Sequence, residues 1–368
     1  MKITMQVRKS LQLKMNFSII MKLERGATIM KKYIVCIVGL LFLTNLPIQA
    51  QGVTKVGTTA AGFLLIDASP RATAMGSAYV SVANDASSMY WNPAGIAKVT
   101  NFDASFTNSK WIADLSYNYA GAVVGLGDFG NLGVNATFLT MGQIERTTLT
   151  SPDGTGEFFD AGSYAFGLCY ARNLSTQFAI GFNAKYINER IYHSSSSGFA
   201  FDVGTLFDTQ LYGLMLGMSI SNFGTKMQLD GSDLIVQHDI DPAHNGNDPN
   251  VNALLQTSAF DLPLLFRVGV SIDVLKGIFN SNLILSADAL HPSDDVESVN
   301  VGGEYVFENI ISVRMGYKGL FNKNSEQGMT YGVGIRANLG GTSIYFDYSY
   351  ITFGVLNNVN MFAVGLGL

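Results

Sequence analysis

The side chains that could do catalytic chemistry are few and scattered along the sequence. Four histidines, none paired in the His-Glu-x-x-His spacing of a helical zinc site, lie in predicted loops or at strand ends: His193, His238, His244 and His291. The serine run 194–197 lies between His193 and Asp202, but it has no nucleophile-elbow context, so we interpret it as a flexible loop. The sequence therefore favours a protein that is not an enzyme.

Candidate binding sites for metals and phosphates are equally weak. The stretch HDIDPAHNGNDPN (238–250) is rich in Asp and Asn and could hold calcium through oxygen ligands, but its spacing is not that of a calcium loop. We interpret it as a solvated acidic loop. The glycine turns GTGEF and GGEY are followed by no phosphate-loop lysine. The two cysteines, Cys36 and Cys169, exclude a cysteine metal cluster. We expect no cofactor.

The composition indicates a chain that lies in a membrane without membrane helices. Hydrophobic residues make up 48% and charged residues only 14%, against about 25% in an ordinary globular domain. Glycine (39), Phe (24) and Tyr (16) are abundant, yet no stretch after residue 50 approaches the roughly 18 apolar residues of a membrane helix. Such a composition is typical of strands with one face in lipid. The net charge of −5 argues against a nucleic-acid partner.

The N-terminal region has the pattern of a secretory signal. In MKKYIVCIVGLLFLTNLPIQAQG (30–52), Lys31 and Lys32 precede an apolar core that is too short to span a bilayer, and a cleavage region ends at Ala50. The pattern predicts a signal peptide over residues 30–50. Residues 1–29 are interpreted as an upstream extension that comes from an early start codon.

From residue 102 onwards the apolar residues alternate with polar or small ones. In TYGVGIRANL (330–339), for example, Tyr331, Val333 and Ile335 fall on one face. This period of two predicts β-strands rather than helices. We expect strands at 102–109, 114–126, 130–140, 162–172, 176–189, 198–208, 212–223, 263–274, 280–290, 297–307, 310–319, 329–339, 342–353 and 359–368.

These strands are long enough to cross a membrane, and the connections between them alternate in length. Tight turns at 127–130, near Asn173, at 308–309 and at 340–341 alternate with longer connections at 141–161, 190–197, 224–262 and 320–328. Residues 102–368 are therefore predicted to be all-β, a transmembrane antiparallel barrel of about 14 strands in a bacterial outer membrane, with both chain ends periplasmic. The predicted inward faces carry polar candidates for the lumen: Arg267, Asp273, Arg314, Lys318, Arg336 and Asp347.

Residues 51–101 do not alternate and are rich in small side chains. We expect them to form a small hatch inside the barrel, with a knuckle at SSMYWNPAGIAKV (87–99) whose aromatic pair packs on the inner wall. Pro93 would turn the chain and Gly95 would allow a close backbone approach. A periplasmic tail is the alternative. The predicted hatch residues are Arg71, Asp85, Tyr90, Trp91, Asn92, Pro93, Ala94 and Gly95, with Arg71 and Asp85 paired to each other or to polar wall residues.

Two stretches resemble known proteins. RATAMGSAYVSVANDASSMYWNPAGIA (71–97) resembles the hatch of FadL-like outer-membrane proteins (the OmpP1/FadL/TodX superfamily), and within it the PorV/PorQ family of type IX secretion. GGEYVFENIISVRMGYKG (302–319) resembles a late hairpin of PorV-like chains. The resemblance implies a fourteen-stranded barrel with an N-terminal hatch and a gram-negative host of the Bacteroidetes type.

The resemblance leaves two main functions open. A PorV/PorQ-like secretion component would bind secreted proteins with C-terminal sorting domains, or other secretion subunits; the connection 224–262, with DLIVQ and ALLQTSAFDLPLLF, offers an apolar docking surface or else a lid over the barrel mouth. A FadL-like channel for hydrophobic small molecules would need an apolar lumen, and the polar lumen candidates favour the first function. A structural barrel without a transport role is a third possibility. Outer-membrane lipid is an expected partner in each case.

Overall fold

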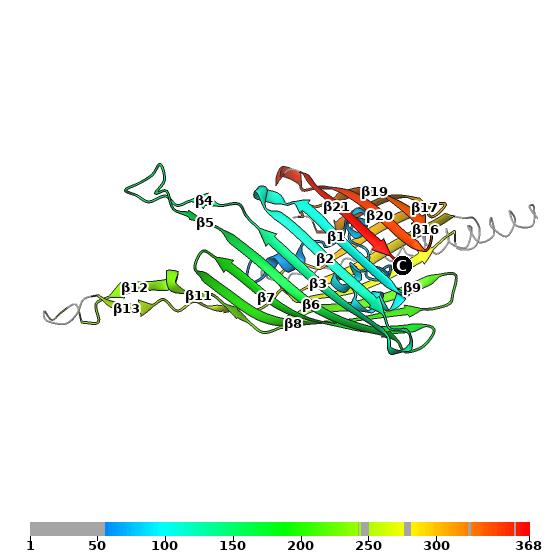
Figure 1. Ribbon diagram of the computed structural model, residues 1–368, viewed down its shortest axis with the longest axis horizontal. Helices are drawn as coiled ribbons and strands as arrows, with labels where there is room; N and C mark the ends of the chain where they lie inside the picture. The colour runs from blue at the N-terminus through cyan, green and yellow to red at the C-terminus, as the bar shows by residue number, and fades with distance from the viewer. Residues whose placement is uncertain (1–55, 242, 244–249, 276–280, 323–324, 357) are drawn as a thin grey trace, which may run out of the picture. The chain divides into compact units, whose positions relative to one another are not determined.

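The computed structural model describes residues 56–241, 243, 250–275, 281–322, 325–356 and 358–368 (Figure 1). The predicted signal peptide and the predicted extension before it lie outside the described residues, as does the start of the predicted hatch. None of the helices in the described part of the chain is long and apolar enough to cross a membrane.

Fourteen antiparallel strands form a closed barrel. In ring order they are β1 (Phe102–Lys110), β2 (Ser116–Gly125), β3 (Asn131–Thr140), β6 (Ala161–Asn173), β7 (Phe178–Ile191), β8 (Ser194–Asp208), β9 (Leu214–Gly224), β15 (Leu265–Asp273), β16 (Ser281–Pro292), β17 (Ser298–Phe307), β18 (Ile311–Leu320), β19 (Met329–Leu339), β20 (Thr342–Thr352) and β21 (Asn358–Gly367). The last strand pairs with the first, from Asp103 opposite Gly367 to Lys110 opposite Asn360. The predicted fourteen-stranded barrel is confirmed.

Each strand alternates between an apolar outer face and a small or polar inner face. In β19, Tyr331 and Val333 are exposed, whereas Thr330, which directly precedes Tyr331, is fully buried. A sheet closed into a barrel requires this alternation, because one face meets lipid and the other the lumen. The period of two in the sequence therefore reflects the two environments on either side of the barrel wall.

The connections at one edge of the barrel are short and those at the other edge are mostly longer. The two longest fold into hairpins: β4 (Ile144–Glu145) pairs with β5 (Phe158–Phe159), and β12 (Ile235–His238) pairs with β13 (Val251–Leu254). Figure 1 shows both hairpins extending beyond the barrel strands. The remaining short strands are β10 (Met227–Gln228), which pairs with β14 (Ala259–Phe260), and β11 (Asp230–Gly231), which pairs with β8.

One predicted connection is wrong. The segment 190–197 was expected to be a long loop with a flexible serine run, but only Tyr192 and His193 separate β7 from β8. The serines continue β8 and pair with β7, with Ser196 opposite Glu189. Ser194 and Ser196 are buried on the inner face, so the run follows the same alternation with hydroxyls in place of glycine or alanine.

The N-terminal segment, which we define as residues 56–101, has no strand of its own. Its helices are short: η1 (Gly62–Leu65), α2 (Pro70–Ala74), α3 (Ser88–Trp91) and η2 (Pro93–Lys98). Helix α2 contacts β18, β19, β20 and β21, while η2 contacts β3, β6, β7 and β8. Because these two groups of strands lie in different arcs of the closed ring, the segment spans the space that the ring encloses. The other short helices lie in connections: η3 (Ile112–Asp114), η4 (Gly127–Phe129), η5 (Ser232–Leu234) and η6 (Gly354–Leu356).

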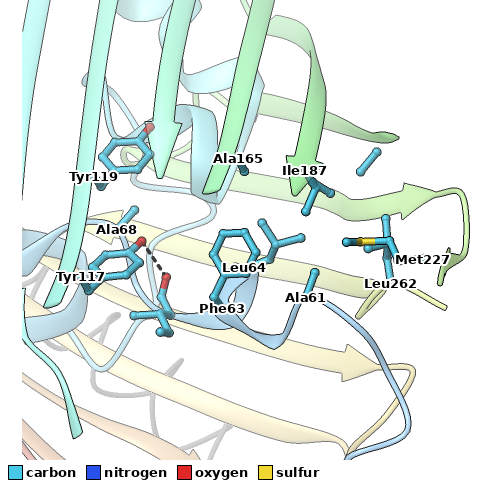
Figure 2. Close-up of a cluster of buried hydrophobic side chains, with 12 residues drawn as sticks. Ala61, Phe63, Leu64, Ala68, Tyr117, Tyr119, Ala165, Ile187, Met227 and Leu262 are labelled. Atoms are coloured by element: carbon cyan, nitrogen blue, oxygen red, sulfur yellow. Dashed lines mark hydrogen bonds between the residues drawn. The ribbon is translucent and has the colours of Figure 1, made fainter. Parts of the chain in front are cut away.

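A buried apolar cluster joins the start of this segment to the barrel wall (Figure 2). Phe63 and Leu64 pack there among wall side chains such as Ile187, and the hydroxyl of Tyr117 donates a hydrogen bond to the carbonyl of Ile66 at 3.1 Å. Met227 and Leu262, the two ends of the long connection between β9 and β15, close the cluster. The base of that connection is thus packed onto the N-terminal segment.

Candidate functional site

Asn92 organises the knuckle that the sequence singled out. Its side-chain oxygen accepts a hydrogen bond from the Ala94 amide at 3.1 Å and caps η2, the role for which Asn is favoured at a helix start. Its amide nitrogen donates to the carbonyls of Val80 at 2.8 Å and Thr205 at 2.9 Å. One fully buried side chain therefore joins the helix, the chain before it and strand β8.

Glycines on the inner wall make room for this knuckle. A Cβ atom added at Gly204 in β8 would collide with Asn92, and one added at Gly181 in β7 would collide with the backbone of Pro93. The same holds across the ring, where Gly302 and Gly316 lie against the backbone of Met75 and its neighbour. Glycine within a strand marks such a close approach of another chain segment.

A buried arginine of the wall lies against the aromatic pair of the knuckle. The rings of Tyr90 and Trp91 meet edge to face, with centroids 4.9 Å apart, and Tyr79 meets Trp91 at 6.0 Å. The guanidinium of Arg267 lies 5.5 Å from the centroids of both Tyr90 and Trp91. Burial raises the pKa of the Tyr90 hydroxyl above its usual value, so this hydroxyl stays neutral.

A network of ion pairs connects α2 to strands β17, β18 and β20 of the wall. Arg71 donates to both carboxylate oxygens of Glu304, at 2.9 and 2.7 Å, and contacts Asp85 at 3.3 Å. Arg314 donates to Glu304 at 2.7 Å and to Asp347. Each carboxylate thus has a cation, and each arginine has an acid. Buried charges require such pairing, since an unpaired buried ion is strongly destabilising.

Further polar contacts lie at other points of the ring. Asp288 of β16 accepts hydrogen bonds from the backbone amides of Tyr79 and Val80, at 2.7 and 2.9 Å. Lys318 of β18 pairs with Asp67 of the N-terminal segment at 3.0 Å. The segment is thereby held on several sides by side chains of the wall.

The six predicted lumen residues fall into two groups. Arg267, Arg314 and Asp347 are buried within the barrel, and Lys318 reaches the N-terminal segment. The other two lie near the edge with the short turns. Asp273 accepts hydrogen bonds from backbone amides at the turn between β15 and β16, and the exposed Arg336 lies 5.1 Å from the ring of Tyr345.

Glu304, the centre of the network, was not among the predicted residues. It follows Gly302 by two positions on the inner face of β17, so the alternation that pointed to Arg314 could have found it. Asp288 was also missed. It shares the inner face of β16 with Ser286, so the alternation could have found it too. The third missed group is the pair of Lys185 and Asp202, which are 2.8 Å apart on the inner faces of β7 and β8.

Among the described residues, the histidine beside the serine run does not form a catalytic triad. His193 and Ser194 both contact the carboxylate of Asp233, each at 3.2 Å, so the histidine does not lie between acid and hydroxyl as a nucleophilic triad requires. Asp202, the acid near the serine run in sequence, pairs with Lys185 inside the barrel. Across the described ranges, no group of three or more His, Cys, Asp or Glu side chains could hold a metal ion.

Comparisons with known proteins agree with this architecture. The family model described as type IX secretion system protein PorV matches residues 49–241. Among solved structures, the CymD monoaromatic hydrocarbon channel is similar at a TM-score of 0.52 and 10% identity, over 82% of this chain and 97% of that one. The toluene transporter TodX of Pseudomonas putida gives a TM-score of 0.49 at 10% identity, over 80% of this chain and 96% of that one. At 10% identity, the similarity to CymD shows a shared fold only. No curated protein matches the sequence.

Proposed function

Because the chain belongs to the PorV family of type IX secretion system proteins and folds as an outer-membrane barrel, we propose that it is a secretion component that binds protein partners. The partners would be secreted proteins with C-terminal sorting domains, or other subunits of the secretion machinery. The family match carries this proposal, and two features of the barrel support it.

The first feature is the projecting hairpin β12–β13. Its side chains Ile235, Val236 and Leu254 are exposed, and Leu255 beside it is exposed as well. The two strands pair only with each other within the described residues, so each has a free edge. Exposed apolar side chains and a free strand edge are the features by which a protein captures another chain. The hairpin therefore suits docking better than the alternative role of a lid, since it is the base at Met227 and Leu262 that packs on the barrel.

The second feature is the content of the barrel interior. A channel for hydrophobic molecules would need an apolar lumen, whereas the inner wall here carries Glu304, Arg314 and Asp347, all engaged in ion pairs. The N-terminal segment spans the same interior. This favours protein binding at the outside over passage through the middle.

Two further assignments belong to the same proposal. Residues 51–101 would act as a hatch that closes the barrel, with its predicted signature residues holding it in place. Both chain ends would face the periplasm, because short turns are typical of the periplasmic edge of outer-membrane barrels, and β1 begins and β21 ends at that edge.

The test is a gentle purification of the tagged protein from its native outer membrane, followed by mass spectrometry of proteins and lipids. We expect secretion subunits, or secreted proteins that share a C-terminal domain. A double variant, Ile235→Ser with Leu254→Ser, should lose these partners, because both side chains are exposed on the hairpin and face each other across its strands. Ile144→Ser, in the other projecting hairpin, is the matched control. A barrel that carries only fatty acids or other hydrophobic molecules would overturn the proposal in favour of a transporter.

A further inference from the structure

The outer face of the barrel wall is hollowed over strands β1, β2 and β3, which lie side by side in Figure 1. The hollow has a volume of about 670 Å³, and its lining exposes almost no polar surface. Strand β2 pairs with both of its neighbours along its whole length, without a shift of register. The hollow is therefore a depression in a closed wall and not an opening through it.

The register of the strands explains the hollow, because side chains that point outward from paired residues line up in rows across the wall. In one row the order is Phe106, Ala120, Ala136 and Phe166; in the neighbouring row it is Leu366, Ala104, Ala122 and Val134. Four alanines thus form a floor, and the larger side chains on either side of them form the walls of the hollow.

A hydrocarbon chain is the group that fits this hollow. The outer face of an outer-membrane barrel meets the hydrocarbon of the bilayer. Water does not fill an apolar hollow, and an empty one forfeits the van der Waals contacts of the side chains that line it. The acyl chains of the surrounding lipids are the apolar groups that are always available on this side of the wall.

Polar side chains lie just beyond one end of the hollow, toward the edge with the longer connections. Asn118, two positions before the alanine floor of β2, accepts a hydrogen bond from Asn108 of β1 at 2.8 Å. One row further, Lys110 is exposed at the end of β1, and none of the ion pairs in the described part of the chain involves it. The two asparagines are flanked in their row by Phe362 and Phe138. Aromatic side chains are typical of the level where hydrocarbon meets headgroups, which places Lys110 among the headgroups.

We propose that this face of the wall binds one membrane lipid with an anionic phosphate headgroup. Its acyl chain fills the alanine hollow, and its phosphate lies at Lys110, a point charge of the kind that binds phosphate, beside the amide of Asn118. Apolar floor, amide and cation follow one another along β1 and β2 in the order of the parts of a lipid. The site lies on the membrane face of the barrel, so it stands or falls independently of partner binding at the hairpin β12–β13.

Defined lipids test the site. The barrel, refolded in a non-ionic detergent, is mixed with equal amounts of phosphatidylglycerol and phosphatidylcholine that carry the same acyl chains, and bound lipids are counted by native mass spectrometry. We expect one retained lipid per barrel, with phosphatidylglycerol preferred roughly fivefold, the contribution of about one lysine at a membrane surface. Equal retention of the two lipids would overturn the assigned headgroup, and a barrel that retains neither would overturn the site.

A pair of double variants tests the place of the acyl chain. Ala120→Leu with Ala122→Leu fills the floor of the hollow, so the barrel should lose both lipids. The matched control is Ala287→Leu with Ala289→Leu, which adds the same atoms to the outer face of β16 and should leave lipid retention unchanged. Heat-modifiable migration on a gel checks that each variant forms the barrel. Equal retention by the two folded variants would show that the chain does not lie in the hollow.

The headgroup has its own test, which does not depend on the leucine variants. Lys110→Gln changes an exposed side chain and should keep one bound lipid but lose the preference for phosphatidylglycerol. Arg172→Gln removes an exposed cation from the outer face of β6, at the edge with the short turns, and should keep that preference. If Lys110→Gln selects phosphatidylglycerol as strongly as Arg172→Gln does, the phosphate does not lie at Lys110.

Discussion

Asn92 shows how much one side chain can hold in a barrel interior. It satisfies three backbone groups on three parts of the chain, and the side chain itself is fully buried. Replacing it with alanine leaves these groups unpaired, which costs about 1–3 kcal/mol of unfolding free energy or more, since more than one group is affected. We expect Asn92→Ala to lower the urea midpoint of the refolded barrel clearly, whereas Asn108→Ala, on the exposed face of β1, should have little effect. Equal midpoints for the two variants would contradict this role.

Glu304 gives a second prediction at the scale of the residue. It is the shared acceptor of Arg71 and Arg314, and its removal leaves two buried guanidinium groups short of a carboxylate. Breaking a buried ion pair in this way costs roughly 3–5 kcal/mol. Glu304→Ala should therefore unfold at much lower denaturant than the parent. The control is Glu157→Ala, which removes an exposed ion pair with Arg146 and should cost about 1 kcal/mol or less. A Glu304 effect as small as that of Glu157 would show that the network adds little stability.

At the scale of the element, the N-terminal segment packs closely on the wall because the wall carries glycines at the points of contact. Gly204→Ala places a methyl group against Asn92, so either the strand or the knuckle must shift, at a cost of roughly 1–3 kcal/mol. Gly162→Ala in β6 is the matched control, because its nearest neighbour would be 3.7 Å away, an ordinary contact. The comparison is made by denaturant unfolding and by protease protection of the N-terminal segment. If the two variants behave alike, the close approach at Gly204 is not required.

The strands were predictable from sequence for a physical reason. Lipid on one side and a packed lumen on the other impose the same alternation on every strand, and in β19 or β15 the polar face differs sharply from the apolar one. The loop predicted at 190–197 was wrong because serine is small and polar. Ser194 and Ser196 therefore fit a loop and the inner face of a strand equally well. The hairpin β12–β13 was missed as a structure because its pairing is local and exposed, with no buried face to impose a pattern.

The candidate site was less predictable than the strands. The knuckle was visible because Tyr-Trp-Asn-Pro is an unusual combination, and the polar inner-face residues followed from the alternation. The sequence does not indicate which of these side chains contact each other. Arg71 and Glu304, for example, are 233 positions apart, and their contact depends on the closure of the ring.

At the scale of the whole molecule, the N-terminal segment and the barrel depend on each other. The segment is made first, yet Asp288, Glu304 and Thr330, which bond to it, belong to the last third of the chain. The segment therefore cannot complete its contacts until the late strands are in place. The wall in turn presents buried charges and bare glycines that only the segment covers. The two must reach their final packing together.

This mutual dependence gives a prediction about permeability. A chain that lacks residues 56–101 exposes the paired charges of the wall, Glu304 and Arg314 among them, to a water-filled lumen. In planar bilayers, we expect the chain that keeps residues 56–101 to conduct ions poorly and the shortened chain to conduct strongly, because the wall that remains is polar. If the shortened chain does not insert, the double variant Arg71→Ala with Asn92→Ala loosens the segment without removing it and should show frequent openings. Conductance that is the same with the segment, without it and with it loosened would mean that residues 56–101 do not close the barrel.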